Sequence, residues 1–120
     1  AGRNTQVDEP KGGPVPKYLL EVNYSVDGVK GVLAKGGSAR RAAAQAAAES
    51  VGGKVESFFF ALGSTDVYLI ADFPDNAAAA ALALSVTASG GAAVTTTALL
   101  TPEEIDKAAG AKVKYQPPGS

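Results

Sequence analysis

Alternation of apolar and polar residues along the chain predicts four β-strands. In residues 17–24, Tyr18, Leu20 and Val22 fall on one side of an extended chain and Glu21 falls on the other. Only two residues separate the second strand-like run from the third, which predicts an antiparallel hairpin. The three further runs are rich in Val, Phe, Tyr or Thr, which favour strands: residues 54–62, 65–73 and 92–100.

Helical segments are expected between these strands. A short helical stretch opens near Asp27, and a longer Ala-rich helix follows with Ser38 as its expected N-cap. A second Ala-rich helix covers residues 77–89, and Thr101 followed by Pro102 predicts the start of a short last helix. The order β-α-β-β-α-β predicts a ferredoxin-like α+β fold, in which two helices cover one face of a four-stranded antiparallel sheet. The other face of the sheet remains open.

The chain of 120 residues is expected to form one domain with one core. Residues 1–16 are rich in Pro and Gly and predict a flexible arm, which either stays disordered or lies along a neighbouring subunit. Residues 17–110 form the predicted domain, and residues 111–120 form a C-terminal tail.

Residues 76–102 contain no Asp, Glu, Lys or Arg. A surface helix normally has a polar stripe opposite its apolar one, and loss of charge is typical of the centre of protein interfaces. We therefore expect this charge-free segment to be buried against other copies of the chain in a homo-oligomer. The alternative is an Ala-rich helix with a neutral outer surface. A membrane span is not expected, because the helix is shorter than the roughly 20 residues that a bilayer requires.

Composition narrows the chemistry. The chain has no Cys and no His, which excludes thiolate nucleophiles, His-dependent catalytic triads and the commonest transition-metal ligands. We expect no metal site and no cofactor. A net charge of -1 predicts no binding to nucleic acid. The first thirty residues contain no apolar signal segment, so the expected location is cytoplasmic.

The first candidate site lies on the open sheet face. The predicted strand order places Glu21 beside Asp66 and Tyr68, so that two carboxylates and a phenol converge. A partner subunit that enclosed these groups would create the surroundings of a general base, without a cofactor. The alternative is an ordinary half-solvated sheet face.

The second candidate site is the GGSARR segment. Ser38, Arg40 and Arg41 follow a Gly-rich turn at a helix N-terminus, which suits a phosphate or carboxylate. The alternative is a helix break followed by solvated arginines, and the sequence of a P-loop is absent. The run Phe58, Phe59 and Phe60 places aromatic rings on both sides of its strand. Packing between subunits explains these rings better than stacking on nucleic acid bases does.

With these segments identified, the chain resembles the GYD domain family of small bacterial proteins over about residues 16–118. The resemblance is carried by KYLLEVNYS, GGSARR, GGKVESFFFALG, PDN and LLTPEE. It implies a ferredoxin-like subunit of the dimeric α+β barrel type, in which open sheet faces meet, and it implies no established reaction. The segment that names the family falls at residues 63–66, where Thr65 replaces the usual tyrosine.

These observations favour a self-associating structural or interaction protein rather than an enzyme. The alternative function is a small-molecule-binding or cofactor-free proton-transfer enzyme that uses Glu21, Asp66 and Tyr68 between sheet faces. A closed polar pocket between those faces favours the enzyme, and a filled apolar seam favours the structural protein.

Overall fold

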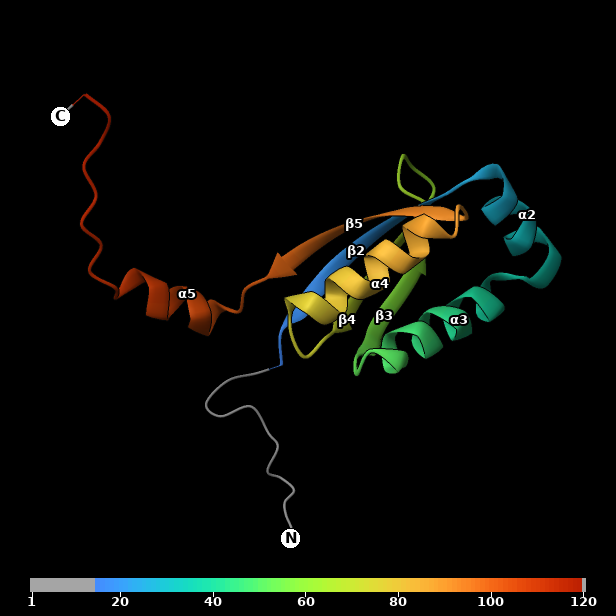
Figure 1. The fold of residues 1–120 in the computed structure, drawn as a ribbon, viewed down its shortest axis with the longest axis horizontal. Helices are drawn as coiled ribbons and strands as arrows, with labels where there is room; N and C mark the ends of the chain where they lie inside the picture. The colour runs from blue at the N-terminus through green and yellow to red at the C-terminus, as the bar shows by residue number, and fades with distance from the viewer. Residues whose placement is uncertain (1–14, 120) are drawn as a thin grey trace, which may run out of the picture.

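The computed structural model describes residues 15–119 (Figure 1). The arm expected over residues 1–16 therefore lies almost wholly outside the described residues. Three helices and four strands precede a last, separate helix. In chain order the elements are β2 (Lys17–Tyr24), α2 (Val26–Lys35), α3 (Gly37–Ser50), β3 (Lys54–Phe60), β4 (Val67–Asp72), α4 (Asn76–Ala88), β5 (Ala92–Leu99) and α5 (Pro102–Ala109).

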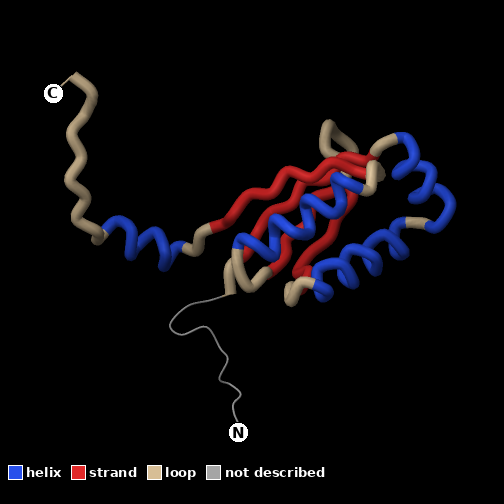
Figure 2. The backbone as a smooth tube through the Cα atoms, in the orientation of Figure 1, coloured by secondary structure: helices blue, strands red, loops and turns tan. Residues whose placement is uncertain are grey.

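The four strands form one antiparallel sheet in the order β3-β4-β2-β5. This order places the first and third strands of the chain at the centre, as in the ferredoxin-like fold. Helices α3 and α4 lie on the same face of the sheet, and no helix covers its other face (Figure 2). The predicted fold class is confirmed.

The core lies between the sheet and these two helices. Tyr18, Leu20 and Val22 alternate along β2 with residues of the open face, as the sequence pattern predicts. On the neighbouring strand, Val67 and Leu69 face the same way. Because α3 and α4 are built mainly from alanine, each supplies a single fully buried side chain to this core: Ala48 and Ala79.

The first helical stretch begins one residue earlier than expected and ends before Gly36, as expected. Helix α2 starts at Val26, because the Ser25 hydroxyl caps it and accepts a hydrogen bond from the amide of Gly28 at 3.1 Å. The prediction of Ser38 as the N-cap of α3 is wrong. Gly36 occupies the cap position with a φ of 88°, a backbone conformation that suits glycine, and it makes no side-chain cap. Ser38 is the second residue of the helix.

Helix α5 is stabilised locally and lies apart from the sheet (Figure 1). Thr101 and Glu104 form a reciprocal capping box, with the Glu104 amide donating to the Thr101 hydroxyl at 3.0 Å. None of its residues is buried, and Ile105 is 51% exposed. Of the helices that the structure describes, none is long and apolar enough to cross a membrane.

The charge-free segment, residues 76–102, contributes little to the core of the single chain. Ala79 is its one buried residue, and Leu84 on the outer side of α4 is 71% exposed. Strand β5 carries part of this segment along an edge of the sheet. The burial of this segment by another copy therefore stays a prediction.

The two edge strands of the sheet differ. Strand β3 carries Lys54 and Glu56 and has a register irregularity between Val55 and Ser57. Strand β5 pairs with β2 without interruption along its full length and carries no charged side chain.

Candidate functional site

The open sheet face is made of cross-strand rows. One row runs across all four strands and consists of Phe59, Tyr68, Glu21 and Thr95. Two of its members are large apolar or aromatic groups in contact with solvent, since Phe59 is 69% and Tyr68 is 41% exposed. The next row adds two aliphatic side chains to this apolar surface, and its members are Ser57, Ile70, Leu19 and Thr97.

A cluster of charges borders this surface. The Lys17 ammonium contacts the Glu56 carboxylate at 2.7 Å and the Asp72 carboxylate at 2.8 Å. The hydrogen bonds to Asp72 and Glu56 raise the pKa of Lys17 to about 12. Lys54 stands directly opposite Asp72 in the register. Two basic and two acidic side chains therefore share this end of the face, and their formal charges cancel.

The structure brings together two of the three predicted catalytic residues. Glu21 and Tyr68 are direct partners across β2 and β4, so their side chains emerge side by side on the open face. Asp66 lies at the end of β4, where its carboxylate accepts a hydrogen bond from the amide of Tyr24 at 2.9 Å. Its own amide donates to the Val22 carbonyl at 3.0 Å. These bonds give Asp66 a part in joining the two central strands.

Thr65 is a member of this site that sequence reasoning did not select. It is 8% exposed, and its hydroxyl donates to a Glu21 carboxylate oxygen at the long distance of 3.5 Å. Its position within residues 63–66, the segment that gives the GYD family its name, could have indicated that Thr65 belongs to this site. Glu21, Tyr68 and Thr65 form a small polar group within the apolar open face.

The predicted anion site is split by the helix. Ser38 and Arg41 are exposed on α3, whereas Arg40 turns inward and is half-buried. The Arg40 guanidinium carbon lies 6.0 Å from the centre of the Tyr24 ring, within the range of a cation–π contact. The three residues therefore do not converge on one anion at the helix N-terminus.

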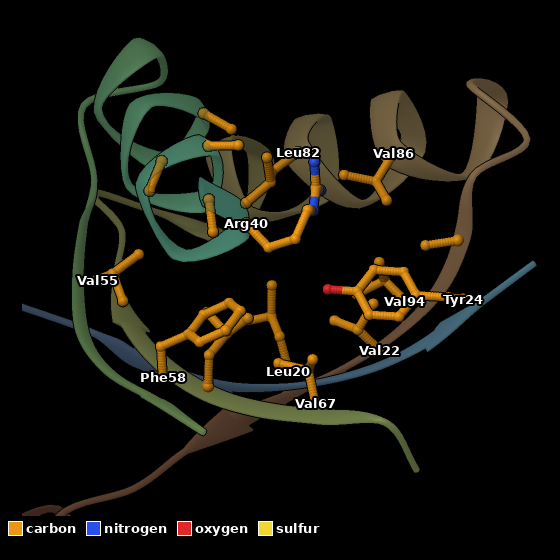
Figure 3. Close-up of a pocket in the computed structure, with 16 residues that line it drawn as sticks. Leu20, Val22, Tyr24, Arg40, Val55, Phe58, Val67, Leu82, Val86 and Val94 are labelled. Carbon is orange, nitrogen blue, oxygen red and sulfur yellow. The ribbon is translucent and has the colours of Figure 1, made fainter. Parts of the chain in front are cut away.

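A cavity lies behind Arg40, between α3, α4 and the sheet (Figure 3). Its volume is about 90 Å³. The Tyr24 hydroxyl and the Arg40 side chain both point into it, and Val22, Leu20 and Phe58 form part of its apolar wall (Figure 3).

A wider groove continues from the cavity toward solvent. The groove has a volume of about 830 Å³ and runs between α2, α3 and α4. It shares Tyr24, Arg40 and Leu82 with the cavity, and it adds the charged residues Asp27 and Lys35. The cavity and the groove together lie on the side of the sheet opposite to Glu21 and Tyr68.

Within residues 15–119, no cluster of three or more His, Cys, Asp or Glu side chains is arranged to hold a metal ion. The acidic groups of the open face are either paired with Lys17 or separated along the strands.

Comparison with known proteins supports one family. No curated protein and no solved structure matches the chain. The GYD domain family model matches residues 18–109, which include helix α5 and all of the sheet except Lys17, the first residue of β2. The chain therefore belongs to the GYD domain family.

Proposed function

We propose that this protein is a self-associating structural or interaction subunit whose open sheet face packs against a second copy of itself. The observation that carries the proposal is the exposure of Phe59 and Tyr68 side by side on a sheet face that no helix among residues 15–119 covers. Leu19 and Ile70 extend the same surface by one row. Large exposed apolar patches on small proteins usually mark interaction sites.

The charges of the open face are compatible with burial. Lys17 is compensated by Glu56 and Asp72, and Lys54 stands opposite Asp72, so this end of the face enters an interface without a net charge. Glu21 is the acidic group in the central row, and the Thr65 hydroxyl lies beside it. A partner surface must therefore leave water or a polar group at Glu21.

Helix α5 gives independent support. The family match extends to residue 109 and so includes this helix, although no residue of α5 is buried in the single chain. Its capping box stabilises it as a helix, and Ile105 gives it an apolar surface that residues 15–119 leave exposed. A second copy that lies against the sheet would offer α5 the surface that it lacks.

The test measures the association constant by sedimentation equilibrium. Phe59→Lys places a charge on the open face beside Tyr68, and we expect it to weaken association at least about 10-fold, since it buries an unpaired charge. Leu84→Lys is the matched control, because Leu84 is equally exposed but lies on the outer side of α4. An interface through the open sheet face predicts that its association constant is unchanged, whereas burial of residues 76–102 between copies predicts that it falls.

Two outcomes would contradict the proposal. A wild-type chain that sediments as a monomer at concentrations of about 100 µM has no stable self-interface. Dissociation by Leu84→Lys with Phe59→Lys still associated would move the interface from the sheet to the charge-free segment.

A second candidate function rests on the contact group Glu21, Tyr68 and Thr65. This group supports a small-molecule site or cofactor-free proton transfer between sheet faces, with Glu21 as base and Tyr68 as hydrogen-bond donor to the substrate oxygen. Asp66 has no role in this proton transfer, because its carboxylate already accepts a hydrogen bond from the Tyr24 amide.

Deuterium exchange of acetylacetone, followed by NMR, tests this second function with a simple carbon acid. Proton transfer by this site predicts faster exchange with the wild-type chain and loss of the acceleration in Glu21→Gln. Tyr68→Phe is expected to reduce it less. Exchange at the rate of buffer alone, or an acceleration that survives Glu21→Gln, removes Glu21 as a base.

A further inference from the structure

The cavity between α3 and α4 has the features of a ligand site on the helix-covered side of the sheet. Alanines at positions 43, 44 and 47 of α3 leave space where larger side chains would close the gap to α4. Leu82 and Val86 bound the space from α4. An apolar space of this kind can take up apolar groups.

Arg40 gives the cavity a charged end. The structure shows no carboxylate partner for Arg40 within residues 15–119, whose ion pairs all involve Lys17. Its guanidinium is half-buried and lies over the ring of Tyr24, which orients it along the cavity wall. A bound anion would accept charge-assisted hydrogen bonds from this guanidinium.

Tyr24 supplies a second polar contact at the same end. Its hydroxyl points toward the centre of the cavity near the Arg40 side chain (Figure 3), and it has no hydrogen-bond partner among the residues that the structure describes. Asp27 and Lys35 are the charged residues of the outer groove besides Arg40, and their opposite charges offset each other. Arg40 therefore determines the charge at the mouth of the cavity.

We propose that this cavity binds a small apolar monocarboxylate, with the carboxylate between Arg40 and the Tyr24 hydroxyl and the hydrocarbon part against Leu20, Val55 and Phe58. The guanidinium and the phenol donate hydrogen bonds to the two carboxylate oxygens. The cavity of about 90 Å³ takes the end of a short chain, and the adjoining groove of about 830 Å³ leaves room for a longer one.

This inference does not rest on self-association through the open face. The cavity lies on the opposite side of the sheet, so loss of the sheet-face interface leaves it intact, and loss of ligand binding leaves the interface intact. Measurement of both properties on each variant separates the two proposals.

The test titrates the protein with octanoate and, separately, with octan-1-ol, and follows the backbone amide signals by NMR. We expect octanoate to shift the signals of α3 and α4. Arg40→Gln is expected to weaken octanoate binding about 10-fold or more, because a charge-assisted hydrogen bond is lost, and to leave octanol binding within about twofold. Arg41→Gln is the matched control, since its side chain is exposed on the same helix.

A second pair of variants tests the space rather than the charge. Ala44→Leu places a larger side chain in the cavity, and we expect loss of binding of both probes. Ala46→Leu is its control, because Ala46 is exposed and does not line the cavity. Thermal unfolding of each variant confirms that it is folded before the titration.

Three results would overturn the proposal. The first is the absence of any signal shift with octanoate up to about 5 mM. The second is an equal weakening by Arg41→Gln and Arg40→Gln. The third is octanoate binding that survives Ala44→Leu in a folded protein.

Discussion

The two faces of the sheet use the same strands for different purposes. On the helix-covered face, Tyr18, Val67 and Phe73 are at most 3% exposed. On the open face, Phe59 and Tyr68 keep 69% and 41% of their surface in solvent. Because side chains alternate along a strand, each strand contributes one set of residues to the core and one set to a surface. The core-facing residues stabilise the fold, and the open-face residues are therefore not needed for the core and stay exposed to solvent.

The largest expected difference between the faces is in stability. Phe73→Ala removes a fully buried ring that packs edge-on against Tyr18 at 5.5 Å between ring centres, and we expect a loss of about 3–5 kcal/mol. Phe59→Ala on the open face is expected to cost less than about 1 kcal/mol in the monomer. Urea denaturation at low protein concentration measures both. Equal losses would break the division between core and surface.

The next largest effect on stability is expected where α2 contacts the turn before β5 on the helix-covered side. A Cβ on Gly28 would overlap the Gly91 carbonyl oxygen, which also accepts a hydrogen bond from the Ser25 amide at 3.0 Å. Gly28→Ala is therefore expected to push α2 away from β5 and to cost about 1–3 kcal/mol. Gly31→Ala meets open space in the same helix and is expected to stabilise it by about 0.5–1 kcal/mol. Thermal unfolding of the two variants should shift in opposite directions.

A smaller effect separates neighbouring threonines of β5. The Thr96 hydroxyl faces the helices and is buried without a hydrogen-bond partner, whereas Thr95 is exposed on the open face. Thr96→Val keeps the shape and removes the unsatisfied group, so we expect a gain of about 1 kcal/mol. Thr95→Val should leave the denaturation midpoint of the monomer unchanged. A loss of stability in Thr96→Val would show that the hydroxyl has a partner.

The smallest effect is the pH dependence of the open face. The pKa of Lys17 is raised from 10.5 to about 12 in the folded chain. Its contribution to stability is therefore complete below pH 10.5 and is lost as the pH rises through about 12. Lys17→Met should lack this step, so the stability difference between wild type and variant should change as the pH rises through about 12, measured by denaturation across that range. Lys54→Met, on the neighbouring edge strand, should retain it.

The strands and their order could be predicted from the sequence because alternation and turn residues are local signals. Tyr18, Leu20 and Val22 face the core as their spacing indicates. The prediction of Ser38 as an N-cap was wrong because Gly36 accommodates the sharp turn between α2 and α3 by its positive φ. A capping side chain is then unnecessary.

The sites were harder to predict because they depend on tertiary distances. Sequence spacing placed Glu21 beside Tyr68, but it did not show that the Asp66 carboxylate accepts the Tyr24 amide at 2.9 Å. The inward position of Arg40 and the outward position of Arg41 follow from helix rotation relative to the sheet. The cavity depends on the separation of α3 and α4, which no local pattern encodes.

The unequal edges of the sheet limit how far strand pairing between copies extends. The edge at β5 is straight and uncharged, whereas the edge at β3 carries Lys54, Glu56 and an irregular register. Charged and irregular edges resist the addition of another strand. Pairing of β5 with β5 of a second copy would be two-fold symmetric, and the outer edges of the joined sheet would be the two charged, irregular β3 strands. Strand addition at β5 would therefore give closed pairs rather than open-ended filaments.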